Sequence, residues 1–343
     1  MRLTIKSTLM CVSFAAALHS AAHFAEIHAH AAGPVTGASR PFRLNIVAQR
    51  PAQQDQGEKM GFIENLIDAD RLQEARKRLM QETGSRGEDY RTAYLEAKIL
   101  FKEKRFHDSL NKLESSLALG GHHSEVYKLM ASNAIALSRM DVAESNLKIA
   151  AQLAPDDHDV HYRLGILYFL SDRFALCESE MQRVVKLRPT LMSAHDILGL
   201  ALEELGQDKA AINAYRKAIE LTRQQGLNDE KPYLHLGKFY SRNGRYQESL
   251  PFLQEAIDIN PKSAESFFLL GKVQSHLGEN QKAQAALQRS VQIDPKYPDP
   301  YYLLSRIHLK QGREVDAARE MQLYLEARKH QKLKDEDGRH AVR

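Results

Sequence analysis

Three groups of residues have the chemistry to bind a metal ion or to attack a substrate, and each lies in a different part of the chain. His23, His28 and His30 lie close together in the stretch HFAEIHAHA, and imidazoles at this density can collect zinc or copper. The stretch DDHDVH, residues 156–161, sets two more histidines beside aspartates. Cys177 is the third candidate, because a thiolate is a strong nucleophile.

A structural explanation is favoured for each group. The N-terminal histidines fall in a segment with the composition of a targeting sequence or linker, so we expect their clustering to be incidental. The aspartates of DDHDVH stand at the start of a predicted helix, where carboxylates cap backbone N–H groups, and His161 falls on a core position. Cys177 falls at a predicted contact between helices, which favours a buried thiol.

Motifs for catalysis are missing from the sequence. It contains no glycine-rich phosphate loop, no HExxH, no GxSxG and no pair of cysteines at metal-ligand spacing. We therefore expect a protein without enzyme activity, cofactor or metal.

Prolines recur along the chain at one spacing. Pro155 and Pro189 are 34 residues apart, and so are Pro261 and Pro295. Placing each at position 32 of a 34-residue unit gives repeats that begin at residues 90, 124, 158, 192, 230, 264 and 298, with four extra residues at 226–229. Seven copies of one unit predict stacked pairs of helices.

Two positions of this unit carry only small residues. They are Ala97, Ala131, Gly165, Gly199, Gly237, Gly271 and Ser305 at position 8, and Ser109, Ala143, Cys177, Ala211, Ser249, Ala283 and Ala317 at position 20. Helices approach closely where side chains are small, so both positions predict a crossing of two helices. Glycine stands at position 15 of the last four repeats, where a positive φ would let the chain reverse.

The units resemble tetratricopeptide repeats, whose 34-residue pattern runs aromatic, Leu-Gly, Tyr, Ala, Phe and Pro. The best copy is Tyr233, Leu236, Gly237, Tyr240, Ser249, Leu253, Ala256 and Pro261. The resemblance covers residues 90–331, and a weaker unit extends it back to about Met60. It implies an all-α fold, a right-handed superhelical solenoid of antiparallel helix pairs with seven full repeats plus a partial N-terminal unit. The atypical end units are expected to hide the apolar faces of the array.

The resemblance also places positions 2, 5, 9, 12 and 13 of each repeat on the concave face of the solenoid. These positions hold Tyr94 and Tyr162 in early repeats and acidic residues, including Asp196 and Glu203, in the fourth full repeat. In the last three repeats the set is Lys231, Lys238, Arg242, Phe268, Lys272, His276, Tyr302, Arg306 and Lys310. Basic and aromatic side chains together suit an acidic peptide or a C-terminal carboxylate, and the alternative is a solvated helix face that binds nothing.

The N-terminal segment has the layout of a secretory signal peptide. Residues 1–22 begin with Arg2 and Lys6, continue with an apolar run too short to span a bilayer, and end in small residues. An uncleaved N-terminal helix is the alternative. Residues 23–58 predict a flexible linker, 59–331 the repeat solenoid, and 332–343 a charged disordered tail. We therefore expect an exported protein, either periplasmic or secreted.

Charge and cysteine content limit the partners further. Without Arg2 and Lys6, 46 basic residues face 44 acidic ones, a net charge of about +2 that gives no argument for a nucleic-acid partner. No segment outside the signal peptide is apolar enough to cross a membrane. Cys177 would be the one cysteine of the mature chain, which excludes an intramolecular disulfide.

Three hypotheses for function follow. The first is a scaffold without catalytic activity that binds peptide segments of partner proteins in its concave groove, in the cell envelope. The second is a structural subunit of an envelope assembly for pili, secretion or outer-membrane biogenesis, and the third is a regulatory partner of a separate enzyme. Repeats specify an architecture and not a ligand, so the partner and the oligomeric state stay open.

Overall fold

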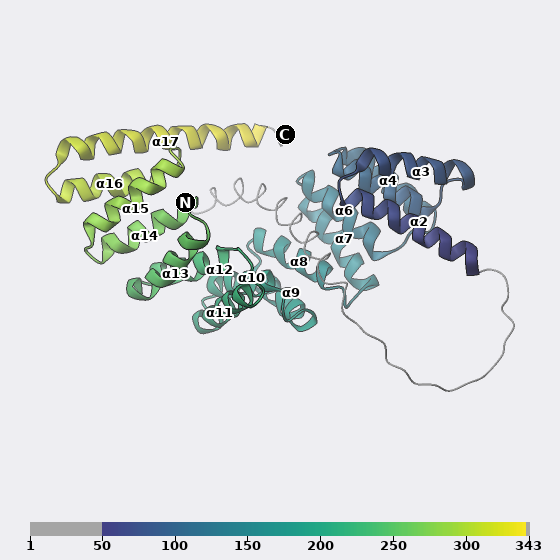
Figure 1. Ribbon diagram of the computed structural model, residues 1–343, viewed down its shortest axis with the longest axis horizontal. Coiled ribbons are helices and arrows are strands. Elements are labelled where there is room, and N and C mark those ends of the chain that lie inside the picture. The colour runs from purple at the N-terminus through teal and green to yellow at the C-terminus, as the bar shows by residue number, and fades with distance from the viewer. Residues whose placement is uncertain (1–49, 341–343) are drawn as a thin grey trace. The chain divides into compact units, whose positions relative to one another are not determined.

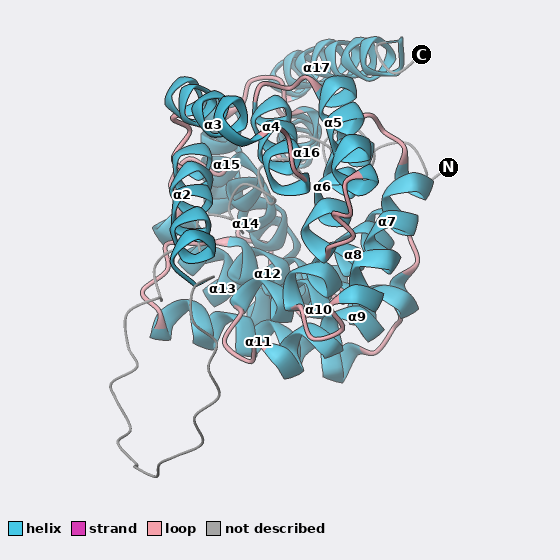
Figure 2. Ribbon diagram, turned by 90° about the vertical axis from the view of Figure 1, so that its right-hand side faces the viewer, coloured by secondary structure: helices cyan, strands magenta, loops and turns pink. Residues whose placement is uncertain are grey.

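The computed structural model describes residues 50–340, and every regular element within that range is an α-helix (Figures 1 and 2). The predicted all-α fold of repeated helix pairs is therefore confirmed. The chain divides into two compact units, residues 1–160 and 161–343, where the sequence predicted one continuous array. The division falls inside helix α8 (His158–Leu170).

The first unit contains three helix pairs and the start of α8. They are α2 (Arg50–Asp68) with α3 (Leu72–Arg86), α4 (Tyr90–Lys102) with α5 (Phe106–Ala118), and α6 (Ser124–Ala136) with α7 (Met140–Leu153). A capping box starts α4: Asp89 Oδ1 accepts hydrogen bonds from the backbone N–H groups of Arg91 and Thr92, and Thr92 Oγ1 accepts one from the Asp89 N–H. This cap sets the first residue of the first full repeat.

The second unit contains the rest of α8 and nine further helices. They are α9 (Phe174–Leu187), α10 (Met192–Glu204), α11 (Asp208–Gln224), α12 (Lys231–Arg242), α13 (Tyr246–Ile259), α14 (Ala264–His276), α15 (Asn280–Ile293), α16 (Pro298–Lys310) and α17 (Glu314–His340). Three of the first helices, α10, α14 and α16, begin at the residues where the 34-residue spacing begins a repeat. The helix α12 begins one residue later than that spacing predicts.

Small residues at position 8 allow the two helices of one repeat to touch. A Cβ atom added to Gly199 would lie 2.6 Å from ring carbons of Tyr215, and one added to Gly237 would lie 2.8 Å from Cδ2 of Leu253. Both distances are shorter than van der Waals contact, so no larger residue fits without displacing its neighbour. In the same crossing the Ser249 hydroxyl donates a hydrogen bond of 2.6 Å to the carbonyl oxygen of Gly237.

The turn inside each repeat uses a left-handed residue at position 15. In the last four repeats this residue is glycine, with φ between +71° and +79°. Lys104, Ser138 and Asp172 occupy the same position in three earlier repeats, with φ of 61°, 60° and 56°. The chain reversal therefore needs this conformation in every repeat, and glycine adopts it without the strain that a Cβ atom adds.

Two predicted boundaries are corrected by the structure. The helix α2 begins at Arg50, inside the predicted linker, and α17 continues to His340, inside the predicted tail. The first extension includes three glutamines and Glu58, and the second includes Lys332, Lys334 and Glu336, residue types that favour helix. Adding residues to an existing helix also avoids the cost of a new nucleus. The predicted signal peptide, the linker up to residue 49 and residues 341–343 lie outside the described residues.

Candidate functional site: the inner face of the last three repeats

Six basic residues form two rows across the first helices of the last three repeats. Position 9 holds Lys238, Lys272 and Arg306, and position 13 holds Arg242, His276 and Lys310. Four residues separate the rows, which is about one helical turn, so each pair shares one face of its helix. The helices α12, α14 and α16 lie in sequence beside one another, with Cα atoms of successive helices within 8 Å. We call these six residues the cation array.

Two members of the cation array are neutralised by acidic residues of neighbouring repeats. Lys238 Nζ lies 2.6 Å from Glu265 Oε1 on α14, and Arg242 Nη1 lies 2.9 Å from Glu203 Oε1 on α10. Glu203 also accepts a hydrogen bond of 2.8 Å from the hydroxyl of Tyr215. These cations therefore help to join successive repeats and are less available to a ligand.

The other members form an open cluster at the C-terminal side of the array. Lys272, Arg306 and Lys310 have no carboxylate oxygen within 4 Å among the residues that the structure describes. The ring of His276 stacks on Tyr246, with centroids 4.5 Å apart and planes 7° from parallel. Burial, and then the charges of Lys272, Lys310 and Arg306, lower the pKa of His276. The cluster thus gathers three uncompensated cations around an imidazole that is mostly neutral at neutral pH.

Lys231 is the first residue of α12 and occupies position 2 of its repeat. It is exposed, and its backbone N–H donates to Asp229 Oδ1 over 3.0 Å.

On α16, burial raises the pKa of Asp299, and the charges of Arg328 and Lys272 oppose that rise. Asp299 therefore interacts electrostatically with Lys272, which lies on the preceding first helix, α14.

Position 5 does not provide the aromatic ligand surface that the sequence predicted. Tyr162 is only 7% exposed, and Tyr94 is half-buried and packs against two apolar clusters. Phe268 contacts Tyr297 edge to face, with ring centroids 5.2 Å apart. Tyr302 alone of these four aromatic residues is exposed, at 39%. Position 5 lies between repeats, so its aromatic residues build the array, and this corrects the predicted role of Tyr94, Tyr162 and Phe268.

The other residues with potential chemistry have structural roles. His161 is 3% exposed, and its Nδ1 lies 2.7 Å from Glu180 Oε2. Cys177 is buried, and burial, with the nearby charges of Glu178 and Glu180, raises the pKa of its thiol to about 12. Asp157 Oδ1 accepts a hydrogen bond from the Asp159 N–H at the start of α8.

Some predictions concern the chain as a whole. His23, His28 and His30 lie outside the described residues. Between residues 50 and 340, no three or more His, Cys, Asp or Glu side chains are grouped to hold a metal ion. In the same range no helix has both the length and the apolar character needed to cross a bilayer.

Sequence reasoning missed a buried ion pair beside the cation array. Nδ1 of His235 lies 2.9 Å from Oδ1 of Asp196, whose side chain is 8% exposed. Burial lowers the pKa of His235, but the charge of Asp196 and the hydrogen bond to it have a larger combined effect, so the net pKa is raised. His235 falls at position 6, where the repeat pattern assigns no chemistry, and no sequence signal linked it to Asp196.

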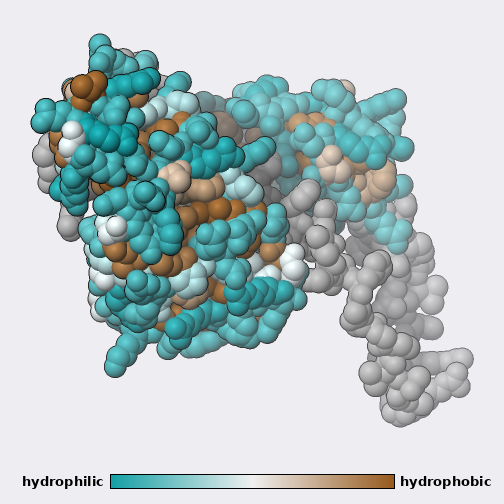
Figure 3. Space-filling model, turned by 60° about the vertical axis from the view of Figure 1, so that its left-hand side comes forward, coloured by the Kyte–Doolittle hydropathy of each residue, from teal (hydrophilic) through white to brown (hydrophobic). Residues whose placement is uncertain are grey.

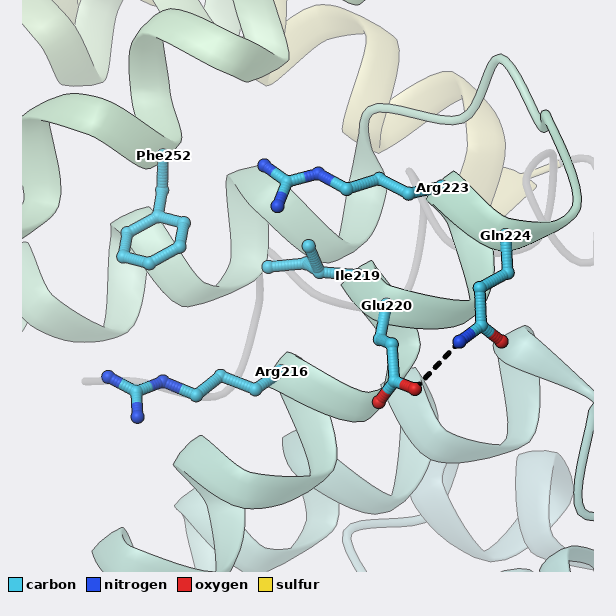
Figure 4. Close-up of a pocket in the computed structure, with 6 residues that line it drawn as sticks. All are labelled: Arg216, Ile219, Glu220, Arg223, Gln224 and Phe252. Carbon is cyan, nitrogen blue, oxygen red and sulfur yellow. Dashed lines mark hydrogen bonds between the residues drawn. The ribbon is translucent and has the colours of Figure 1, made fainter.

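A second missed feature is an open pocket on the second helices. Its volume is about 400 Å³, and its lining residues are Arg216, Ile219, Glu220, Arg223, Gln224 and Phe252 (Figure 4). Gln224 donates a hydrogen bond of 2.8 Å to Glu220 across one turn of α11. None of the residues predicted to bind a ligand lines this pocket, which is formed by α11 and α13.

Comparison with known proteins identifies the repeats. Residues 171–336 match the tetratricopeptide-repeat family described as the Cilia and flagella-associated protein 70 C-terminal domain. These residues are tetratricopeptide repeats. The tetratricopeptide array is 26% identical over 141 residues to anaphase-promoting complex subunit CDC16 of Saccharomyces cerevisiae. That match covers 38% of this chain and only 16% of the yeast subunit.

Solved structures show the same fold. The tetratricopeptide array is similar to the APC/C hetero-tetramer Cut9-Hcn1, with a TM-score of 0.57 and 16% identity over 71% of this chain and 48% of that chain. It is also similar to the C-terminal part of a TPR repeat-containing protein from Cytophaga hutchinsonii, with a TM-score of 0.56 and 15% identity over 68% of this chain and 95% of that chain. The predicted solenoid of helix pairs is therefore confirmed.

Proposed function

We propose that this protein is a protein–protein interaction scaffold that binds acidic segments of partner proteins at the cation array. The observation that carries the proposal is the open cluster, in which Lys272, Arg306 and Lys310 have no carboxylate partner among the described residues. Like charges gathered without a carboxylate in direct contact repel one another, and an acidic ligand relieves that repulsion. The scaffold role needs no catalytic group.

The division of the cation array into paired and open members refines which residues bind. A ligand that reached Lys238 or Arg242 would have to displace Glu265 or Glu203. At the open cluster a ligand carboxylate displaces only water, and Arg306 can hold it through two parallel hydrogen bonds. Exposed ion pairs contribute about 0.2–1 kcal/mol each, so the cluster selects acidic partners and speeds their association more than it sets total affinity.

A pair of charge reversals tests this proposal. The probe is a capped, fluorescently labelled peptide rich in Glu and Asp, compared with the same peptide carrying Gln and Asn. We expect Lys272→Glu with Lys310→Glu to reduce binding of the acidic peptide at least tenfold in fluorescence anisotropy, because it replaces attraction by repulsion. The matched control is Lys209→Glu with Arg289→Glu, which makes the same change in net charge on exposed residues of α11 and α15. Equal losses in both double variants would show a bulk charge effect and would exclude the cluster as the site.

We also propose that the mature protein works outside the cytoplasm, in the cell envelope or the medium. The support is the order of basic, apolar and small residues in residues 1–22. Cell fractionation together with determination of the mature N-terminus tests it. Removal of a segment ending at Ala22 or Ala31 in exported protein is expected, whereas cell-retained protein that keeps Met1 contradicts export.

A further inference from the structure

The first full repeat shows which positions one repeat offers to the next. Val126 and Leu129 of α6 belong to an apolar cluster of the first unit. The half-buried residues that pack against it from the preceding repeat are Tyr94, Phe101, Leu110 and Leu117. These four occupy positions 5, 12, 21 and 28. Together they form the surface on which the first helix of the following repeat stacks.

The same positions are covered in the second unit wherever a repeat follows. Leu234 at position 5 and Ile257 at position 28 of one repeat are each 7% exposed. Phe268 at position 5 of the next repeat contacts Tyr297, which immediately precedes α16. Stacking therefore buries both positions in a regular way.

In the last repeat these four positions are open. They hold Tyr302, Leu309, Ala318 and Leu325, which are all exposed, with 39%, 55% and 60% exposed for the three large residues. We call this surface the end face. The left-hand side of Figure 1, which holds α14–α17, comes forward in Figure 3. That view shows apolar patches between hydrophilic residues. The sequence predicted that the last repeat hides its apolar face, and within the described residues the structure shows the opposite.

Basic residues border the end face. Arg306 and Lys310 are exposed on α16, and Arg328 and Lys329 are exposed on α17, one turn after Leu325. The residues one turn before Leu325 are Met321 and Gln322, so no acidic residue lies one turn from it in either direction, although exposed Glu326 is next to it in sequence. Asp299, near the start of α16, is the acidic residue beside this group. The surface thus combines apolar contact with positive charge.

We propose that the end face binds an acidic amphipathic helix of a partner protein, which stacks on α16 and α17 as α6 stacks on α4 and α5. The support is that the end face continues the interface that already joins successive repeats. Removing apolar surface from water is favourable, so covering the two leucines and Tyr302 provides a driving force for binding. Negative charge on the helix would match the basic border.

A second copy of this chain fits the end face less well. The helix pair α2–α3 also exposes apolar residues, Phe62 and Met80, at 49% and 68%. Exposed Lys77 and Arg78 adjoin Met80 on α3, so contact through the Met80 side of this surface would set cations against the basic border of the end face. The partner is therefore expected to be a different, acidic protein.

A peptide taken from this chain provides the probe. Residues 122–138 contain α6, which covers the equivalent positions in the first full repeat. A capped, labelled peptide of this segment with Lys128→Glu is expected to bind the full chain in fluorescence anisotropy, and more tightly than the peptide that keeps Lys128. We expect Leu325→Asp to weaken that binding at least tenfold.

Val315→Asp is the matched control. Val315 lies on the same helix and is 85% exposed, but it occupies position 18, where Gln247 and Gln281 stay exposed although a repeat follows them. The control is expected to bind the probe like the unmodified chain, with an unchanged circular dichroism spectrum for both variants. The inference is wrong if the Leu325 variant binds as the unmodified chain does or if both peptides bind equally. It is also wrong if sedimentation shows self-association that Leu325→Asp abolishes, because a second copy would then cover the end face.

Discussion

His235 of α12 donates a hydrogen bond from Nδ1 to Asp196 of α10, with Oδ1 at 2.9 Å and Oδ2 at 3.0 Å. The contact joins the first helices of two successive repeats next to the cation array. Asp196 is buried, so its charge needs the imidazole as a partner. The pair therefore links the stacking of these repeats to the protonation of one histidine.

This pair predicts a pH-dependent stability. The pKa of His235 is raised in the folded protein, so its contribution to stability is complete below the unfolded value of about 6.5 and is lost as pH rises through the folded pKa. We expect Asp196→Asn to lower the free energy of unfolding more at pH 6 than at pH 9. Urea titrations followed by circular dichroism at both pH values measure the difference. An equal loss at both would show that the histidine is not charged by this contact.

The open cluster predicts a pH dependence of ligand binding that rests on the proposed function. The pKa of His276 is lowered in the free protein by burial and by the three surrounding cations. An acidic ligand reverses that electrostatic cost, so binding is expected to draw a proton onto His276 and to tighten as pH falls from 8 toward the lowered pKa of His276. His276→Gln should flatten the profile without abolishing binding at pH 8. A profile that is unchanged in this variant would assign the proton to another group.

Replacing two different position-8 glycines by alanine is expected to lower the free energy of unfolding by unequal amounts. A Cβ on Gly271 would lie 2.7 Å from Cγ of Leu287 and 3.0 Å from the carbonyl oxygen of Ala283, and that backbone cannot move freely. A Cβ on Gly165 would meet mainly the terminal methyl of Met181, a flexible side chain. We expect Gly271→Ala to cost about 1–3 kcal/mol and Gly165→Ala clearly less, measured by chemical denaturation. The reverse order would contradict the packing at this crossing.

The Cys177 thiol is expected to be unreactive in the folded chain. Burial raises its pKa to about 12, so the thiolate is scarce at pH 8 and a reagent cannot reach the sulfur. In a Cys11→Ser background, we expect Ellman's reagent to react with Cys177 only after addition of denaturant. Fast reaction with the native protein, at the rate of a free thiol, would place Cys177 at the surface.

Much of the fold could be predicted because each repeat satisfies the same local requirements. Gly237 and Ser249 fit a close helix crossing, Gly244 fits the turn, and the 34-residue spacing then positions the helices of every copy. The two boundaries at Arg50 and His340 could not be predicted, because a polar helix end without periodic apolar residues has the composition of a linker.

The candidate site could be predicted only in part. All six members of the cation array could be predicted, because positions 9 and 13 of each repeat are known once the 34-residue spacing is known. The spacing did not predict that Lys238 forms an ion pair while Lys272 does not. The partner of Lys238 is Glu265 on α14, one repeat further along the chain, and side-chain rotamers decide whether the two meet. The spacing also assigned Phe268 to the ligand surface, although the residue that covers it is Tyr297 of the following segment.

The sequence alone determined the helices, their pairing within repeats and the face on which basic residues gather, since these depend on periodicity and on the size of local side chains. Only the tertiary structure decided which charges are compensated and which apolar residues are covered. Both properties depend on neighbours that are a whole repeat away, as Arg242 is from Glu203. They also depend on whether a repeat follows at all, and among the described residues none follows Leu325.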